Sequence, residues 1–129
     1  MDTRRKILSG EAAIQVARQS KGESRKLTVV TGYFDVLQAA QIRHLTEVRK
    51  GAGDGILIIV LLPRTESLLP LQARAELLAG LNMIDYVVIG GEEDALLERL
   101  AADEVIPRQA DDDEQTRRLM EHVLVRHNK

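Results

Sequence analysis

The sequence predicts an α/β domain, a three-layer αβα sandwich around a small, mostly parallel sheet of about four strands. Segments with the apolar pattern of strands alternate along the chain with segments that have the pattern of helices. This alternation is typical of βαβ units, in which helical crossovers join parallel strands. Residues 56–62 (ILIIVLL) are an unbroken apolar run, as expected of a strand buried on both faces of a parallel sheet. Gly32 and Gly90 follow two other apolar runs, where turns into helices are expected.

The first half of the chain supplies the opening helix, a strand and a crossover helix. Residues 10–20 carry small apolar side chains at helical spacing, and the polar stretch 21–26 ends that helix. Residues 27–31 (LTVVT) are short and β-branched, which predicts a buried strand. Residues 38–50 return to helical spacing, and glycines follow them.

The second half continues the alternation after the apolar run, which Pro63 ends. The expected elements are a helix, a strand, a helix, a short strand and a final helix, at residues 71–81, 86–89, 92–101, 104–106 and 112–127. The acidic run 111–114 lies where the final helix begins, and negative charge there complements the helix dipole. No metal site is predicted, because these aspartates lack an obvious set of partner ligands.

Composition indicates one cytoplasmic domain spanning residues 1–129. The absence of cysteine excludes disulfides, thiolate metal sites and cysteine nucleophiles. A net charge of −2 and an aromatic content of 2% argue against a nucleic-acid partner. The N-terminus does not have the pattern of a secretory signal, and the longest apolar run is too short to cross a bilayer, so no membrane partner is expected.

Residues 31–45 (TGYFDVLQAAQIRHL) are the segment most indicative of chemistry. They are predicted to run from a strand through a glycine turn into a helix. The N-terminus of a helix presents N–H groups and a positive dipole end, which suit a phosphate. The carboxyl ends of parallel strands are also where open α/β sheets bind ligands. These features alone indicate a generic phosphate site, since many strand-to-helix turns share them.

The same segment resembles the signature of the cytidylyltransferase-like nucleotidyltransferases, Gly-x-Phe-Asp-x-Leu-His-x-Gly-His. Gly32, Phe34, Asp35 and Leu37 match it in type and spacing. The resemblance covers residues 6 to about 106 and is closest to the adenylyltransferase domain of the bifunctional heptose-phosphate kinase/adenylyltransferase of lipopolysaccharide synthesis. It implies a Rossmann-like fold.

The departures from this signature bear on activity. In the family, the two histidines contact the triphosphate and stabilise charge on the α-phosphate. Here Gln38-Ala39-Ala40-Gln41 replaces the His-x-Gly-His motif. A glutamine can donate a hydrogen bond but cannot carry a proton charge, and Ala40 adds a methyl group where the family has bare backbone. The family's further strand and phosphate-binding turn before the last helix are also missing. We therefore assign no catalytic residue, and Gln38 and Gln41 are interpreted as degenerate catalytic positions.

The candidate nucleotide- or phosphate-binding residues follow from the resemblance. They are Gly32, Tyr33, Phe34, Asp35, Gln38, Ala40, Gln41, Arg64 and Thr116. Asp35 is expected to act structurally as the cap of the following helix. His44 is interpreted as structural, and the last two histidines, His122 and His127, are spaced for no shared site.

Three hypotheses follow. The first is a degenerate nucleotidyltransferase-fold protein that is catalytically inactive and acts by binding a nucleotide or a protein. The second is an active cytidylyl- or adenylyltransferase toward a sugar or polyol phosphate, using Mg²⁺ and ATP or CTP, with Arg64, Arg74 or His44 in place of the lost groups. The third is an oligomerisation module, because loss of an edge strand would expose apolar surface. The expected partners are therefore a nucleotide, a second copy of the chain or another protein.

Overall fold

The computed structural model describes residues 3–35, 37–63, 69–90 and 93–108. A short 3₁₀ turn, η1 (Thr3–Lys6), leads into a five-stranded sheet with the order β1-β4-β3-β2-β5. The strands are β1 (Ile7–Leu8), β2 (Leu27–Gly32), β3 (Ile56–Leu61), β4 (Tyr86–Ile89) and β5 (Glu104–Pro107), and all their pairings are parallel. The helices are α1 (Gly10–Gly22), α2 (Ala39–Ala52), α3 (Leu71–Ala79) and α4 (Glu93–Leu100).

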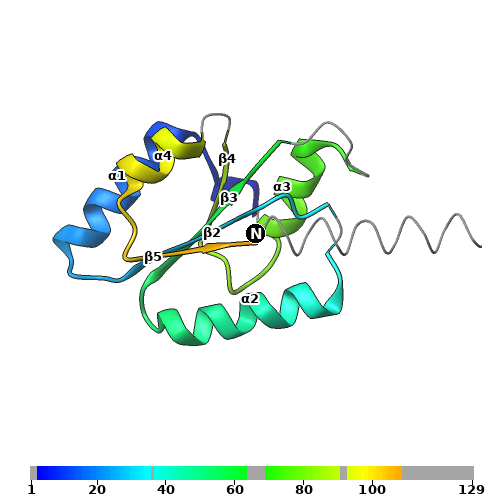
Figure 1. The fold of residues 1–129 in the computed structure, drawn as a ribbon, viewed down its shortest axis with the longest axis horizontal. Coiled ribbons are helices and arrows are strands. Elements are labelled where there is room, and N and C mark those ends of the chain that lie inside the picture. Colours follow the sequence, from blue (N-terminus) through cyan, green and yellow to red (C-terminus); the bar gives the residue numbers. More distant parts are fainter. Residues whose placement is uncertain (1–2, 36, 64–68, 91–92, 109–129) are drawn as a thin grey trace, which may run out of the picture.

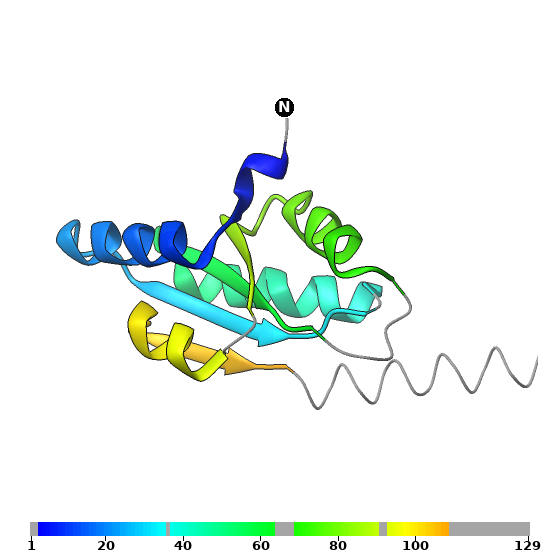
Figure 2. The ribbon, with the colours of Figure 1, turned by 90° about the horizontal axis from the view of Figure 1, so that it is seen from above.

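The helices cover both faces of the sheet, which gives the expected three-layer sandwich (Figure 1). Helices α1 and α4 pack side by side on one face (Figures 1 and 2). The cluster on that face includes Ile14 and Leu100 from the helices and Val29 from β2. Helices α2 and α3 cover the other face, where Leu45 and Leu78 pack against the sheet. Every residue of β2 and β3 is buried, as the apolar runs predicted for the centre of a parallel sheet.

The sheet has one strand more than the sequence analysis expected. The additional strand is β1, which contains two residues and pairs with β4 through Ile7 opposite Val87. Two residues are too short to show a hydrophobic period, and only the tertiary pairing defines them as a strand. The other elements agree in type and position to within a few residues, whereas the expected helix at 112–127 lies outside the described residues.

The amino ends of the strands are joined by a network of charged groups. Arg49 at the end of α2 contacts Asp85 at 2.7 Å and also donates to the backbone oxygen of Gly55 at 2.6 Å. The Asp85 carboxylate accepts from the Leu57 backbone N–H at 2.8 Å, so one side chain connects β3 with the approach to β4. Lys6 donates to the Leu81 carbonyl oxygen at 2.9 Å. Burial lowers the pKa of the Lys6 ammonium from its usual 10.5, and the Asp85 carboxylate opposes that effect.

A close backbone contact explains the glycine at the start of β3. A Cβ atom on Gly55 would lie 2.4 Å from the backbone oxygen of Lys26 and 2.9 Å from that of Ala52. Both oxygens belong to the main chain, so neither can move aside as a flexible side chain would. Only glycine fits where the turn after α2 meets the start of β2. None of the helices in the described ranges is both long and apolar enough to cross a membrane.

Candidate functional site

The candidate site lies at the carboxyl edge of the sheet, in the turn between β2 and α2. The backbone of this turn is strained at Phe34, which has φ of +48°. A bulky residue with positive φ is rare, because the left-handed region costs roughly 1–2 kcal/mol for a residue with a Cβ. Phe34 is 2% exposed and packs in the cluster beneath α2 and α3, so burial of its ring holds the turn in this conformation.

A buried ion pair lies directly behind the turn. Arg74, on α3, and Asp35 approach each other at 3.5 Å, with side chains 1% and 0% exposed. The same guanidinium donates to the carbonyl oxygen of Tyr33 at 2.6 Å and to that of Leu69 at 3.2 Å. A longer contact of 3.5 Å reaches the Leu62 carbonyl oxygen. Arg74 thus ties the turn after β2 to the chain that follows β3 and to the approach to α3.

The N-terminus of α2 is capped by its own side chains. Gln38 is the N-cap residue and has extended backbone angles. The side chain of Gln41, three residues on, folds back, and its Oε1 accepts the Gln38 backbone N–H at 3.2 Å. In a capping box, the side chain of the third helical residue accepts the backbone N–H of the N-cap residue, and here that third residue is Gln41. Gln41 is 2% exposed, so its amide is part of the packed helix start and is not presented to solvent.

The structure brings most of the predicted site residues together. Gly32 ends β2, the turn places Tyr33, Phe34 and Asp35 in sequence, and the exposed Gln38 and Ala40 and the buried Gln41 begin α2. Arg64, Thr116, His122, His127 and the acidic run 111–114 lie outside the described residues. His44 is half-buried one turn along α2.

The expectation that Asp35 caps the following helix is wrong. The N-cap residue of α2 is Gln38, three residues later. Asp35 faces Arg74 in the interior, where a carboxylate requires a partner of opposite charge. In the structure, Asp35 is therefore held by an ion pair with Arg74 and does not cap the helix.

Sequence reasoning did not identify the role of Arg74. Arg74 is one of the candidate replacements for the lost catalytic groups, but in the structure its side chain is buried and its guanidinium is directed at backbone oxygens and Asp35. One signal was available. Arg74 lies one turn after Leu71 and one turn before Leu78, on the face of α3 that carries apolar side chains. A charged residue on such a face predicts a buried partner.

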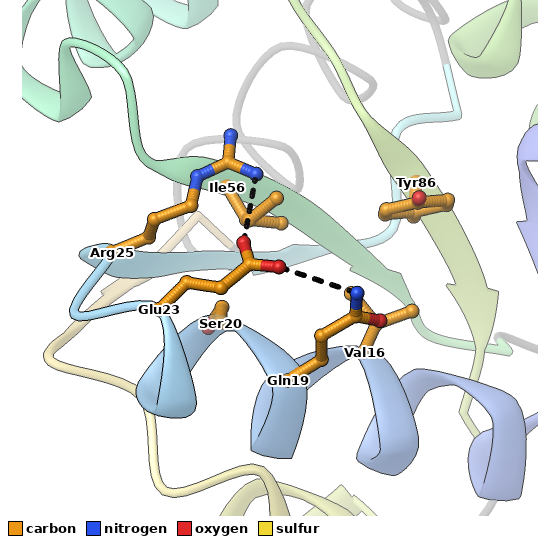
Figure 3. Close-up of a pocket in the computed structure, with 7 residues that line it drawn as sticks. All are labelled: Val16, Gln19, Ser20, Glu23, Arg25, Ile56 and Tyr86. Carbon is orange, nitrogen blue, oxygen red and sulfur yellow. Dashed lines mark hydrogen bonds and ion pairs between the residues drawn. The ribbon is translucent and has the colours of Figure 1, made fainter.

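A cavity of about 120 Å³ lies at the opposite end of the sheet, beside the C-terminal end of α1 (Figure 3). Ile56 and Tyr86 form part of its lining, and Gln19, Glu23 and Arg25 form a polar rim. Gln19 donates to Glu23 at 3.3 Å, and Glu23 lies 3.7 Å from Arg25. Sites for small molecules commonly measure about 300–1,000 Å³, so this cavity is too small to hold a nucleotide.

Metal-binding side chains do not cluster within the described ranges. No group of three or more His, Asp or Glu residues comes together there in a way that could hold an ion. The polar groups at the candidate site are the backbone of the turn, the amides of Gln38 and Gln41, and the buried pair behind them.

The chain is similar in sequence to curated proteins from several organisms. No protein-family model matches the chain. The chain is 31% identical to Bifunctional protein HldE of Wolinella succinogenes over 102 residues, which are 71% of this chain and 21% of that protein. It is 31% identical to the HldE protein of Pasteurella multocida over 109 residues, 78% of this chain and 22% of that protein. The chain thus spans about a fifth of the length of these relatives.

Two further proteins extend the comparison. FAD synthase of Thermococcus onnurineus is 37% identical over 78 residues, which are 54% of this chain and 51% of that protein. Among solved structures, the lipopolysaccharide core biosynthesis protein of Thermoplasma volcanium superposes with a TM-score of 0.56. That match covers 62% of this chain and 71% of the other at 20% identity, so it bears on the fold alone.

Proposed function

We propose that this chain, which belongs to the cytidylyltransferase-like nucleotidyltransferase superfamily, is a member that acts by binding and does not transfer nucleotidyl groups. The observation that carries the proposal is the bond between the Gln38 backbone N–H and Gln41 Oε1 at 3.2 Å. Both residues occupy positions where the family signature has histidine. In this chain, they stabilise the start of a helix.

This self-capping affects substrate binding. A helix N-terminus binds a phosphate through backbone N–H groups that have no partner within the helix. In this chain, the Gln38 N–H already donates to the Gln41 side chain. A nucleotide phosphate that used the Gln38 N–H would have to displace that bond, and it would meet the exposed methyl group of Ala40 in the first turn. We therefore infer weak phosphate binding at this helix end.

The self-capping also affects catalysis. Negative charge grows on the α-phosphate during nucleotidyl transfer, so the transition state gains from a charged or strongly polarised donor. Glutamine remains neutral at every pH at which the protein is folded. Removing one such donor costs an enzyme roughly 3–4 kcal/mol of transition-state stabilisation. The costs of losing two donors at one site need not add, but we expect their combined effect to bring turnover below detection.

The backbone of the turn is held from behind by two features of this chain, the buried ring of the strained Phe34 and the buried Asp35–Arg74 pair. Restoring the contact groups on this framework is therefore a meaningful test. The variant Gln38→His/Ala40→Gly/Gln41→His has the three residues of the family signature and leaves the buried pair unchanged.

The test measures nucleotide binding and pyrophosphate release in parallel. The natural chain should give no calorimetric heat with ATP or CTP and Mg²⁺ at micromolar concentrations. It should also release no pyrophosphate with sugar phosphates beyond a Gln41→Ala control. The restored variant should bind more tightly than the natural chain. Robust turnover by the natural chain would overturn the proposal, and loss of that turnover in a His44→Ala variant would point to transfer through a rearranged site.

A further inference from the structure

The cavity beside the C-terminal end of α1 is separate from the turn between β2 and α2, since it lies at the other end of the sheet. Val16 and Ser20 of α1 line it, together with Ile56 and Tyr86, the first residues of β3 and β4. Its volume of about 120 Å³ equals the space of roughly four liquid water molecules at about 30 Å³ each. A ligand that fills this cavity therefore has roughly five or six non-hydrogen atoms.

A positive charge is held in place at the rim of the cavity. The Arg25 guanidinium donates through Nε and Nη2 to the backbone oxygen of Asp54, at 3.1 and 2.8 Å. Among the residues that the structure describes, its Nη1 group makes no hydrogen bond, and the Glu23 carboxylate lies 3.7 Å from it, beyond hydrogen-bond distance. Arg25 is thus oriented by one end of its planar fork and retains N–H donors at the other, which suit a carboxylate.

A negative charge stands beside that positive charge (Figure 3). One oxygen of the Glu23 carboxylate accepts from Gln19 at 3.3 Å. The other has only the 3.7 Å contact with Arg25 among the described residues. Glu23 is also the C-cap residue of α1, where the helix dipole has its negative end. This part of the rim therefore favours a positively charged group of a ligand.

We propose that this cavity binds a small zwitterion of the α-amino acid class, with its carboxylate on Arg25 and its ammonium group on Glu23. The two charges of the rim are adjacent, as are the two charges of such a ligand. A simple anion or cation would instead meet a like charge next to its partner. The volume of the cavity limits the ligand to small members of the class, such as glycine, alanine and serine. The proposal does not depend on whether the chain transfers nucleotidyl groups.

Titration of the isotope-labelled natural chain with glycine tests the site, with backbone amide NMR signals as the readout. A ligand with so few atoms makes few contacts, so we expect a dissociation constant in the millimolar range. The saturable shifts should be confined to the residues around the cavity. Alanine and serine should bind similarly, whereas leucine, methylammonium and acetate should each bind at least about tenfold more weakly.

Two variants test the assigned roles of the rim charges. Glu23→Gln and Arg25→Met should each raise the dissociation constant of glycine at least about tenfold, because each removes a charge-assisted hydrogen bond. The matched controls are Glu47→Gln and Lys50→Met, which alter an exposed ion pair on α2 and should leave the dissociation constant unchanged. Circular dichroism confirms that each variant is folded.

Three results would overturn the proposal. The first is the absence of saturable shifts at tens of millimolar glycine. The second is acetate, methylammonium or leucine binding as tightly as glycine, since the cavity would then not recognise paired charges on a small molecule. The third is an unchanged dissociation constant in both Glu23→Gln and Arg25→Met, since glycine would then bind elsewhere.

Discussion

Replacing Arg74 with alanine removes a charged partner of the buried Asp35 carboxylate. Both side chains are almost completely buried, and their closest atoms are 3.5 Å apart. Breaking a buried pair by deleting one partner costs roughly 3–5 kcal/mol, because the remaining charge stays in the interior without compensation. The substitution also deprives the Tyr33 and Leu69 carbonyl oxygens of donors at 2.6 and 3.2 Å.

The expected loss is large relative to the whole stability of the domain. Single domains unfold with a free energy of about 5–15 kcal/mol, so Arg74→Ala should lower the urea midpoint steeply or abolish folding. Arg74→Lys keeps a positive charge but replaces a planar fork with a single ammonium, which cannot reach three backbone oxygens and Asp35 together. It should have an intermediate effect. Glu76→Ala, an exposed position on the same helix, is the matched control and should change stability by less than about 0.5 kcal/mol.

Urea unfolding followed by far-UV circular dichroism measures these differences, since the chain has no tryptophan. A cycle with Asp35→Asn, Arg74→Met and the double variant isolates the pair. The double variant should be less destabilised than the sum of the two single variants, because it leaves no uncompensated charge. The reasoning is refuted if Arg74→Ala costs less than about 1 kcal/mol or if the single-variant effects simply add.

Three further predictions concern two backbone positions and the change in the free energy of unfolding at alkaline pH. Ala101 follows α4 with φ of +47° and is exposed, so Ala101→Gly should stabilise the domain by about 1 kcal/mol in urea unfolding, and any destabilisation would contradict this. Gly55→Ala places a Cβ 2.4 Å from a backbone oxygen and should cost at least about 3 kcal/mol; a melting temperature within a degree or two of the natural chain's would contradict it. Lys6 has a pKa lowered by burial, so the unfolded chain binds more protons than the folded chain between the lowered value and 10.5. Stability should therefore gain from Lys6 as pH rises through that window, and the gain should disappear in Lys6→Met when unfolding free energy is measured against pH.

The sequence predicted the sandwich because its signals are local. The unbroken run at residues 56–62 and the β-branched run at 27–31 are long enough to identify central strands, and glycine or proline marks where they end. β1 gave no such signal, since its two residues become a strand only by pairing with β4. The number of strands was therefore underestimated by the one strand whose definition is entirely tertiary.

The candidate site was predictable in position but not in its interactions. The signature from Gly32 to Leu37 located the turn, and the loss of both histidines was visible in the sequence. The bond between Gln38 and Gln41 follows from the rotamer of Gln41, which pattern alone does not determine. The partner of Asp35, Arg74, is 39 positions away along the chain and lies on α3. The local capping rule considers only neighbouring residues, so it could not identify this long-range ion pair.

The strand order also governs when the sheet can be completed as the chain is synthesised. β2 ends at residue 32 and can pair with β3 as soon as residues 56–61 have been synthesised. Its other edge can pair with β5 only after residues 104–107 have been synthesised. The bond between Leu27 and Asp103 spans 76 residues, and the one between Lys6 and Leu81 spans 75. Contacts this distant slow folding, because the chain must close a long loop before it gains any stabilisation. Throughout that interval on the ribosome, the outer edge of β2 is open to pairing with a neighbouring nascent chain.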